Sequence, residues 1–420
     1  MVIVGAGFAG YNAARGLQKH APKAEIVLIN PTDYFLYLPL LPEVSAGVLE
    51  PRRICVSLPA RLPGVRLLLG SVDRIDVVEH RVCWTDPEGR HDEIGFDRLV
   101  LAAGSVNKLL PIPGVAEYAH GFRGIAEALY LRDHVTRQLE LAAMTDDQDE
   151  RDARCTFVVV GAGYTGTEVA AQGQLLTARL TQQLPALRNQ RVRWLLADVA
   201  PRLLPELSAH LSRTADRVLR KRGVEIRTRQ SVAEAGADIL RLTTGEEVAT
   251  RSLIWCVGVR PDPLVDALSL PTRRGRLQVR ATLDVPGYPD LFACGDCAAV
   301  PDMTRPGEIT GMTAQHAERQ GAHAARNVAA ALAGRELTPY RHHDLGFLVD
   351  LGGLQAAANP LQVPLSGPSA RFVTRGYHLY SLPGNRTRTA ADWAINTVLP
   401  PRAVQLGLVG AERVPLECTG

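Results

Sequence analysis

The sequence predicts an α/β protein in which one phosphate-binding unit occurs twice. Two glycine-rich stretches carry this prediction, VIVGAGFAG at residues 2–10 and VVVGAGYTGTE at residues 158–168. Each follows an apolar strand and runs into residues of helical pattern, and a second apolar strand comes next. This order is typical of a Rossmann-like fold with a parallel sheet. A hydrophobic content of 46% fits strands that helices cover on both faces.

The three glycines of the first stretch have distinct physical tasks. Gly5 makes the tight turn after the strand, Gly7 lets the backbone approach a pyrophosphate, and Gly10 lets the following helix pack on the strand. That helix, expected over residues 11–19, offers unpaired N–H groups to the anion. The next strand, EIVLIN, ends at Asn30, where a carboxylate usually meets the adenosine ribose. An Asn side chain can still hydrogen-bond a hydroxyl.

The second stretch repeats this arrangement with a different ending. Gly161, Gly163 and Gly166 take the three glycine positions, and Glu168 is expected in the first turn of the helix. The next strand, VRWLLAD, ends in Asp198, and a carboxylate there suits a ribose diol and repels a 2′-phosphate. This favours NADH over NADPH, although an ordinary carboxylate at a strand end is the alternative. Two such units in one chain predict two dinucleotides.

A third stretch, YPDLFACGDCAAV at residues 288–300, indicates which dinucleotide stays bound. It places Gly295 and Asp296 after a short apolar strand, at what is expected to be another helix N-terminus. It resembles the motif of two-dinucleotide flavoproteins in which the Asp hydrogen-bonds the flavin ribityl chain, while a plain Gly-Asp turn is the alternative. The segment RLVLAAGS, residues 98–105, supplies another strand that ends in small residues beneath a flavin. The first unit is therefore expected to hold FAD permanently, and the second to bind NADH as a substrate.

The expected cofactor-binding residues come from these three stretches and from the strand ends near them. They are Gly5, Gly7, Phe8, Ala9, Gly10, Asn30, Ala103, Gly104, Gly161, Gly163, Tyr164, Thr165, Gly166, Glu168, Asp198, Gly258, Gly295 and Asp296.

Composition excludes several other classes of protein. A formal net charge of +3 over 420 residues gives no basic surface for a nucleic acid. No run of about 18 apolar residues occurs, so no transmembrane helix is predicted. Met1 directly precedes the first strand, which leaves no room for a signal peptide, and a cytoplasmic location is expected.

Seven cysteines occur between Cys55 and Cys418, and one pair of them needs an interpretation. Cys294 and Cys297 form a C-x-x-C motif, which elsewhere suggests redox chemistry. Because this pair flanks the Gly-Asp motif, both are expected to be buried small hydrophobic residues. The odd number and wide spacing of the others suit a reducing compartment. No metal site is expected.

The motifs also predict how the chain is organised. Residues 1–115 and 270–330 are expected to form one discontinuous FAD domain, because the Gly-Asp motif must return to the first sheet. Residues 150–265 would form an inserted NADH domain, preceded by the polar connection TDDQDE at residues 145–150. Residues 335–420 contain no phosphate motif and form a third part.

Together these residues resemble a type II NADH:quinone oxidoreductase, the single-subunit, non-proton-pumping respiratory dehydrogenase. Many flavoenzymes share the glycine stretches, but the likeness covers almost the whole chain. The resemblance implies tightly bound FAD, hydride transfer from NADH to flavin N5, and two-electron reduction of menaquinone or ubiquinone at the membrane. Beyond the glycine stretches it rests on DYFLYLPLLPEVSAG (33–47), ADVAPRLLPELS (197–208), TAQHAERQGAHAARNV (313–328), GFLVDLGG (346–353) and RGYHLYSLPGNRTRTAADW (375–393), of which the last three are the most specific.

The resemblance also implies roles for individual side chains. An Ala-Gln-x-Ala-x-Gln helix lines the quinone tunnel in the family; Gln315 matches its first glutamine, and Arg319 stands where the second would be. Residues four apart share one helix face, so a guanidinium there would hydrogen-bond a quinone carbonyl and stabilise its developing negative charge. A surface arginine is the alternative. Glu168 matches a family glutamate near the flavin and both substrates, the alternative being a helix-start carboxylate.

The C-terminal part is expected to bring the site to a membrane surface, on the cytoplasmic face of the cell membrane. Residues 371–382 and 386–409 mix Arg with aromatic and aliphatic residues, as a membrane-surface helix does. Packing on the body or on the partner in a homodimer is the alternative. Asp350 interrupts GFLVDLGG, and three prolines break residues 357–369. These departures keep three alternatives open: a reductase of a soluble ferredoxin or rubredoxin, a disulfide or sulfide reductase, and an NADH-sensing flavoprotein.

Overall fold

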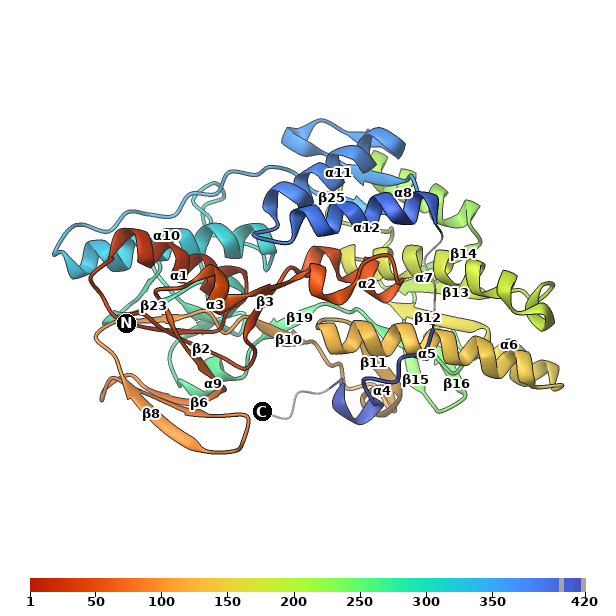
Figure 1. Cartoon of the computed structure of the whole chain (residues 1–420), viewed down its shortest axis with the longest axis horizontal. Coiled ribbons are helices and arrows are strands. Elements are labelled where there is room, and N and C mark those ends of the chain that lie inside the picture. Colours follow the sequence, from red (N-terminus) through yellow and green to blue (C-terminus); the bar gives the residue numbers. More distant parts are fainter. Residues whose placement is uncertain (400–403, 417–420) are drawn as a thin grey trace.

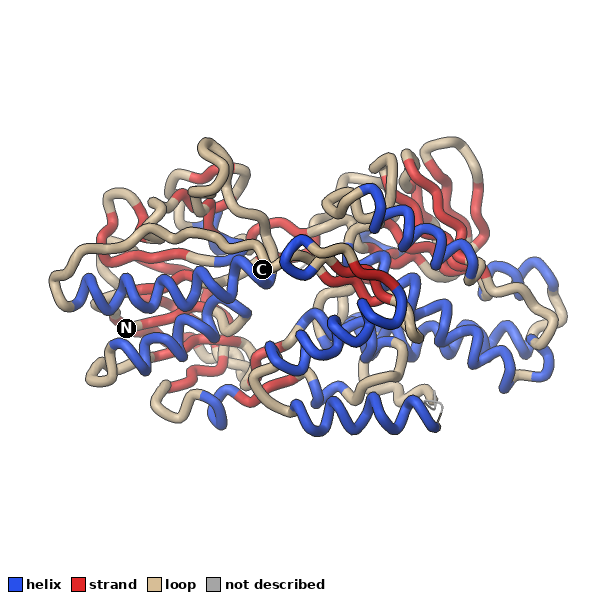
Figure 2. The backbone as a smooth tube through the Cα atoms, turned by 90° about the horizontal axis from the view of Figure 1, so that it is seen from above, coloured by secondary structure: helices blue, strands red, loops and turns tan. Residues whose placement is uncertain are grey.

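The computed structural model describes residues 1–399 and 404–416, and it has one parallel sheet in each half of an elongated molecule (Figure 1). In the view from above, the strands form two groups with helices around them (Figure 2). The C-terminal helices run along one long edge of the molecule. Cys418, and residues 400–403 inside the predicted amphipathic segment, lie outside the described residues. The predicted α/β class is confirmed.

The first sheet has the strand order β22-β23-β9-β1-β2-β5, and every pair except β22 with β23 is parallel. The chain leaves this sheet after β9 and returns to it with β22. Helices α1 (Phe8–His20) and α10 (Ala314–Leu332) pack closely against each other. A Cβ added to Gly321 of α10 would lie only 2.0 Å from the Ala9 carbonyl oxygen of α1, so the contact requires glycine. The strands are β1 (Val2–Val4), β2 (Val27–Asn30), β5 (Arg66–Leu69), β9 (Leu99–Leu101), β22 (Asp284–Val285) and β23 (Tyr288–Ala293).

The second sheet has the strand order β11-β18-β12-β13-β14. Its glycine-bearing strand β12 lies in the interior of the sheet, as β1 does in the first sheet. All pairs of the second sheet are parallel. Phe157 stacks on Trp194 in its core with ring centroids 4.8 Å apart. The strands are β11 (Ala119–Gly121), β12 (Thr156–Val160), β13 (Arg193–Asp198), β14 (Val224–Thr228) and β18 (Leu253–Trp255), and the helices are α5 (Ile125–Met144), α6 (Gln148–Arg154), α7 (Tyr164–Gln183) and α8 (Ala209–Lys221).

Smaller sheets and short helices complete the two halves. The antiparallel pair β10 (Ser105–Asn107) and β19 (Val259–Pro261) joins them where the chain passes from one to the other. The remaining elements of residues 1–300 are β3 (Tyr34–Leu36) with β4 (Cys55–Ser57); β6 (Ser71–Asp76), β7 (Arg81–Thr85) and β8 (His91–Gly95); β15 (Val232–Ala235), β16 (Ile239–Leu242) and β17 (Glu247–Ala249); β20 (Thr272–Arg273), β21 (Arg276–Gln278) and β24 (Ala298–Ala299); and the helices α2 (Leu41–Ser45), α3 (Leu58–Arg61), α4 (Val115–Tyr118) and α9 (Leu264–Ala267).

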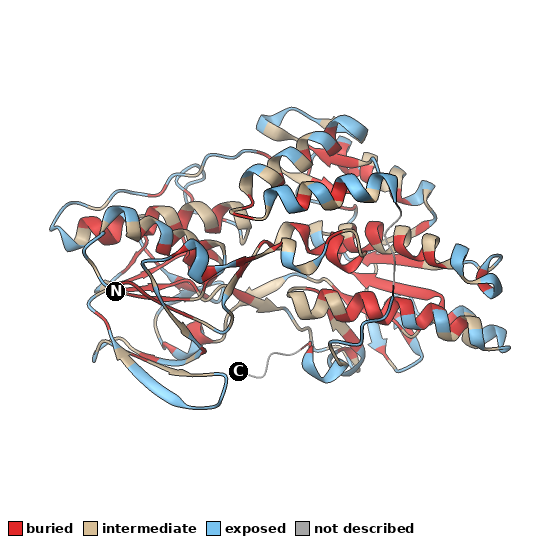
Figure 3. Ribbon diagram, in the orientation of Figure 1, coloured by how far each residue is buried: buried red, intermediate tan, exposed pale blue. Residues whose placement is uncertain are grey.

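The C-terminal part is a small antiparallel sheet followed by a helical hairpin. The sheet contains β25 (Leu348–Asp350), β26 (Ala356–Ala358) and β27 (Leu365–Ser366), and the hairpin contains α11 (Gly367–Ser381) and α12 (Arg386–Val398). Both parallel sheets are buried, whereas α11 and α12 each show an exposed outer face (Figure 3). Within residues 1–399 and 404–416, no helix combines the length and apolar character needed to cross a bilayer.

Three sequence-based expectations about helices were wrong. The predicted 386–409 helix ends at Val398, since Leu399 is extended and prolines follow it in the sequence. The acidic run is only partly a connection, because Asp147 caps α6 and accepts the N–H groups of two following residues. Gly295 and Asp296 open a single 3₁₀ turn rather than an α-helix, because the chain then enters β24 and a loop containing Pro301 and Pro306.

Candidate active site

The first glycine loop has the local geometry that a bound pyrophosphate requires. Gly5 turns the chain at φ +90°, and a Cβ added to Gly10 would lie 1.7 Å from the Gly5 carbonyl oxygen. A Cβ added to Gly7 would find no atom within 4 Å. Helix α1 begins directly afterwards at Phe8, whose ring lies edge-on to Phe35 at 5.0 Å. The loop is therefore tight against the protein at two glycines and open at the third, which fits a phosphate cradle.

The second loop repeats this geometry almost atom for atom. Gly161 has φ +102°, and a Cβ on Gly166 would lie 1.8 Å from the Gly161 carbonyl oxygen. A Cβ on Gly163 again meets nothing within 4 Å. Tyr164 opens α7 and stacks on Phe347 at 5.5 Å, which brings the C-terminal part against this loop. Thr165 beside it is exposed.

The two strand-end residues hold the glycine loops in ways that explain their difference. Asn30 Oδ1 accepts an N–H of the first loop at 2.8 Å, and its Nδ2 donates to the Thr32 carbonyl oxygen at 2.8 Å. Asp198 accepts an N–H of the second loop through Oδ2, and the Ala200 N–H through Oδ1 at 2.7 Å. The second hydrogen-bond partner is thus an acceptor, the Thr32 carbonyl oxygen, for residue 30, and a donor, the Ala200 N–H, for residue 198. An amide therefore fits position 30, and a carboxylate fits position 198.

Asn30→Asp is expected to weaken the retention of FAD. A carboxylate would face the Thr32 carbonyl in place of a donor, so the loop would lose a hydrogen bond and gain a repulsion, which together cost about 1–3 kcal/mol. We expect the dissociation constant, measured by the fluorescence of released FAD on dilution, to rise roughly tenfold or more. Asp198→Asn is the matched control: it should leave FAD retention unchanged and raise the KM for NADH. Equal FAD retention in wild type and Asn30→Asp would contradict this reading.

The Gly-Asp motif meets the first sheet beside the turn between β9 and β10. Ser105 Oγ donates to Asp296 Oδ2 at 2.6 Å, and the Gly295 N–H donates to Gln320 Oε1 on α10 at 2.8 Å. Ala103 and Gly104 form the turn itself, and Gly104, at φ +79°, has open space where a Cβ would lie. The motif is thus tied to both segments of the first unit, to residues 1–115 through Ser105 and to residues 270–330 through Gln320. Gly258, the remaining predicted glycine, has φ +96° and also faces open space.

The two cysteines of the C-x-x-C motif are buried, and no disulfide joins them. Cys294 and Cys297 are fully buried, and Cys297 Sγ lies 3.3 Å from the Cys294 carbonyl oxygen. Burial raises the pKa of both thiols, that of Cys297 to about 11. Neither thiol is therefore a thiolate at neutral pH. The expectation that these residues act as small hydrophobic side chains is confirmed.

Gln315 and Arg319 lie on one face of α10, as their spacing predicts. Arg319 donates to Gln315 Oε1 at 3.1 Å and to the carbonyl oxygen of His343, and its guanidinium lies 3.4 Å from His342 Nδ1. Gln315 Nε2 donates to the Gly346 carbonyl oxygen at 3.2 Å. The arginine is therefore not a free surface side chain. It joins α10 to the segment that leads into β25.

Glu43, Asp350 and Arg371 meet in a buried cluster that the sequence did not predict. Arg371 lies between the two carboxylates, 3.1 Å from Glu43 Oε1 and in contact with Asp350 Oδ2. Trp393 of α12 donates its indole N–H to Glu43 Oε2. All four residues are buried. The cluster ties α2, β25 and both C-terminal helices together.

The cluster sets two carboxyl groups against one guanidinium, so the two acids compete for a single counter-ion. Burial, followed by the charge of Asp350, raises the pKa of Glu43 to about 7. Burial acts in the same direction on Asp350, but Arg371 and a hydrogen bond from Glu43 lower the pKa of Asp350 below its ordinary value. Glu43 is therefore the carboxyl group that takes up a proton as the pH falls through about 7, and Asp350 is the carboxylate that pairs with Arg371.

Glu168 is connected to this cluster through the backbone of Asp350. The Asp350 N–H donates to Glu168 Oε1 at 2.7 Å. Burial raises the pKa of Glu168 well above its ordinary value, and the hydrogen bond from Asp350 opposes this only in part. Burial therefore favours the neutral form of the Glu168 carboxyl. The predicted position of Glu168 in the first turn of α7 was wrong: the helix begins at Tyr164, so Glu168 lies in the second turn. The helix macrodipole acts mainly on the first turn.

Glu43→Gln is expected to make stability less dependent on pH. A folded-state pKa raised from 4.5 to about 7 contributes stability that is fully present below pH 4.5 and lost as the pH rises through 7. The wild type should therefore lose more unfolding free energy than Glu43→Gln between about pH 5 and about pH 8. Urea unfolding at the two pH values measures this difference. Glu79→Gln, an exposed carboxyl, is the control and should follow the wild type; equal pH slopes in all three proteins would rule out a proton on Glu43.

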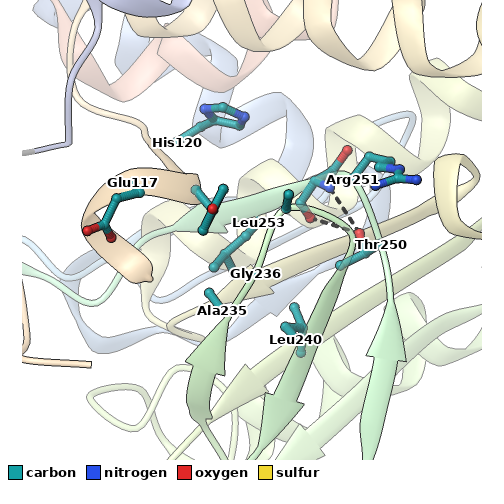
Figure 4. Close-up of a pocket in the computed structure, with 11 residues that line it drawn as sticks. Glu117, His120, Ala235, Gly236, Leu240, Thr250, Arg251 and Leu253 are labelled. Atoms are coloured by element: carbon teal, nitrogen blue, oxygen red, sulfur yellow. Dashed lines mark hydrogen bonds between the residues drawn. The ribbon is translucent and has the colours of Figure 1, made fainter. Parts of the chain in front are cut away.

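A small cavity of about 160 Å³ lies elsewhere, between α4 and the hairpin of β15 and β16 (Figure 4). None of its lining residues belongs to a glycine loop. Thr250 Oγ accepts the Ser252 N–H at 3.0 Å and donates to the Thr156 carbonyl oxygen. The cavity lies apart from both glycine loops and is not part of the candidate site.

Comparison with known proteins identifies the family. Residues 1–321 match the family model described as pyridine nucleotide-disulphide oxidoreductase. The type II NADH:quinone oxidoreductase Ndh of Mycobacterium tuberculosis is 32% identical over 97% of this chain and 89% of its own length. The chain belongs to the type II NADH:quinone oxidoreductase family. The demethylphylloquinone reductase NdbB of Synechocystis sp., 30% identical over 94% of this chain and 97% of its own, is a further relative.

A solved structure shows that the type II family fold extends over almost the whole chain. NDH2 from Plasmodium falciparum, in complex with NADH, superposes with a TM-score of 0.88 over 96% of this chain and 99% of that one, at 17% identity. Such a similarity concerns the fold. Together with family membership, it confirms the resemblance that the motifs indicated and the prediction of two Rossmann-like units.

Proposed function

We propose that this chain is an FAD-dependent NADH:quinone oxidoreductase. The observation that carries the proposal is the repeated glycine loop, each copy on the central strand of its own sheet and each open where a pyrophosphate would lie. Family membership supplies the quinone as acceptor. FAD, when bound, supplies the ring that takes a hydride from NADH and passes two electrons to the quinone.

The first unit, residues 1–115 with 270–330, holds FAD in this proposal. Gly7 and the N-terminus of α1 receive the pyrophosphate. Asn30 holds the glycine loop in place by accepting a hydrogen bond from one of its backbone N–H groups. Asp296, oriented by Ser105, meets the ribityl chain. The residues that the structure places here are therefore suited to bind the cofactor throughout turnover.

The second unit, residues 150–265, binds NADH. Gly163 and the N-terminus of α7 receive its pyrophosphate. Asp198 accepts the ribose hydroxyls and disfavours a 2′-phosphate, so NADH is preferred to NADPH. Tyr164, held against Phe347, places the C-terminal part next to this substrate.

Three side chains serve the quinone in this proposal. Glu168 supplies a proton as the quinone is reduced, because burial raises the pKa of its carboxyl and so favours the proton-carrying form. Gln315 and Arg319, joined on one face of α10, donate hydrogen bonds to the quinone oxygens. The C-terminal residues 335–420 bring the site to the cytoplasmic face of the membrane, and a homodimer is expected.

Glu168→Gln tests the assignment of the proton donor. The amide keeps the size and the acceptor for the Asp350 N–H but has no acidic proton, so the quinone step should slow by about 10²–10⁴-fold. Reduction by NADH, followed as loss of flavin absorbance, should change little. Gln182→Glu, at an exposed position farther along the same helix, is the control and should leave both steps intact. An unchanged quinone step would remove Glu168 from the proposed mechanism.

A further inference from the structure

A basic cavity lies between the first unit and the C-terminal hairpin. Its volume is about 750 Å³, and it is lined by Tyr11 and Arg15 of α1, Arg61 of α3, and residues 383–388 at the turn between α11 and α12. Four of the lining side chains are arginines, Arg15, Arg61, Arg386 and Arg388, and none is a carboxylate. The wall therefore carries a concentrated positive charge that comes from three separate elements.

Most of this charge is not neutralised by the protein. Arg386 is engaged with the carbonyl oxygens of Leu382 and Tyr380. Within residues 1–399 and 404–416, Arg15, Arg61 and Arg388 form no ion pair, although the charge of Glu318 acts on Arg15. Guanidinium groups that line one cavity without an ion-pair partner repel one another, so an anion in the cavity would stabilise them.

The end of a helix adds to this positive potential. Helix α12 begins at Arg386, and its N-cap residue, Asn385, is left-handed and gives no side-chain hydrogen bond to the first turn. That turn contains no acidic residue. Its free N–H groups and the positive end of the macrodipole therefore lie beside the arginines. Basic residues are unfavourable at this end of a helix unless an anion is bound.

The helix that supplies Arg388 also carries exposed apolar side chains on the same face. Arg388, Ala391, Ile395 and Val398 follow one another at spacings of three, four and three residues, and Val398 is 81% exposed. Helix α11 exposes Phe372, also at 81%. A soluble phosphate compound would contact only the arginines, whereas a lipid offers a phosphate and acyl chains to adjacent parts of one surface.

We propose that the Arg15–Arg61–Arg388 cavity binds the phosphodiester headgroup of an anionic lipid, while the apolar faces of α11 and α12 enter the adjoining acyl region. This rests on the proposed function, since a lipid-soluble quinone requires the protein at a membrane. It adds a discrete headgroup site made jointly by the first unit and the hairpin. Headgroup binding would therefore set the orientation of the first unit relative to the bilayer.

The test is binding of the FAD-loaded full chain to vesicles, without NADH or quinone. Vesicles of phosphatidylcholine are compared with vesicles that also contain phosphatidylglycerol, for the wild type and for Arg15→Gln/Arg61→Gln/Arg388→Gln. We expect the preference for anionic vesicles to fall roughly 100-fold in this triple variant, at about fivefold per basic residue. The control, Arg74→Gln/Arg188→Gln/Arg274→Gln, removes the same charge from exposed sites outside the cavity and should keep the preference.

Each outcome decides the proposal. An equal loss in the control, or no preference of the wild type for anionic vesicles, would overturn it. Calorimetric binding of inorganic phosphate or sn-glycerol 3-phosphate that the triple variant abolishes, with no effect on vesicle binding, would assign the cavity to a soluble anion instead. NADH oxidation with a water-soluble quinone is measured separately and should be unchanged in the triple variant. Failure of that activity in the wild type would reject the proposed function and leave the vesicle result intact.

Discussion

Gly163→Val should abolish NADH oxidation in a protein that still carries FAD, whereas Gly7→Val should yield a colourless protein that still binds NADH. At both positions the backbone φ is that of an ordinary residue, −71° and −67°, and a Cβ meets no protein atom within 4 Å. A β-carbon therefore meets only open space at both positions, and we expect the larger valine side chain to occupy the space for the pyrophosphate. We expect kcat/KM for NADH to fall by about 10²-fold or more in Gly163→Val, because a bulky group there displaces the substrate.

The two variants form a matched pair, because each tests one loop and controls for the other. Flavin absorbance of the purified protein measures the first loop, and quenching of protein fluorescence by NADH measures the second. Gly376→Val adds a substitution at a third open glycine, on the exposed face of α11, and should affect neither cofactor. Loss of the same cofactor in both loop variants would contradict the assignment of FAD to the first unit and NADH to the second.

Arg371→Met should be the most destabilising single change in the C-terminal part. It leaves Asp350 buried without its counter-ion and removes the partner of Glu43. Breaking a buried ion pair in this way costs about 3–5 kcal/mol, because a charge is left unpaired away from water. The free energy of unfolding, measured with urea and tryptophan fluorescence, should fall by that amount at neutral pH.

Arg375→Met is the control for this loss. Arg375 lies one turn along the same helix, over the ring of Trp393 at 4.8 Å, and its loss should cost about 0.5–2 kcal/mol. The triple variant Glu43→Gln/Asp350→Asn/Arg371→Met leaves no charge behind and should recover much of the stability. If Arg371→Met were no less stable than Arg375→Met, the cluster would not hold the hairpin in place.

The glycine loops could be predicted from the sequence because their requirements are local. A positive φ at Gly5, and contact between Gly10 and the preceding turn, are properties of a few consecutive residues. The spacing of Gln315 and Arg319 on one helix face was predictable for the same reason. Local geometry does not identify the ligand, however. The cofactor assignments therefore rest on family membership, and the proposed experiments test them.

The buried cluster could not be predicted because its members meet only in the folded chain. Glu43 comes from the first unit, whereas Asp350, Arg371 and Trp393 come from the last part of the sequence. A signal was present, since a charged residue stands inside each of the apolar runs LPLLPEVSAG and GFLVDLGG. Such residues are buried only when they are paired. In the sequence alone Asp350 indicates a break in the membrane-facing pattern, because its partner is not visible there.

The partners of strand-end residues were also beyond the sequence. Asn30 occupies the position where a carboxylate that binds the ribose is typical. The structure explains its amide, because it places the Thr32 carbonyl oxygen where the amide can donate to it. The expected helix after Asp296 was wrong because strand pairing by β24 overrides the pattern of a helix start. Local patterns thus predicted the elements, and tertiary contacts decided their ends.

The central claim is that NADH electrons pass through a bound flavin to a quinone. We would mix the FAD-loaded protein anaerobically with NADH in a stopped-flow instrument, follow the flavin absorbance band, and then add menaquinone or ubiquinone analogues. The account predicts rapid loss of the band with NADH and rapid recovery with a quinone. Loss without recovery by any quinone would contradict quinone as the acceptor, and no loss at all would contradict the NADH site.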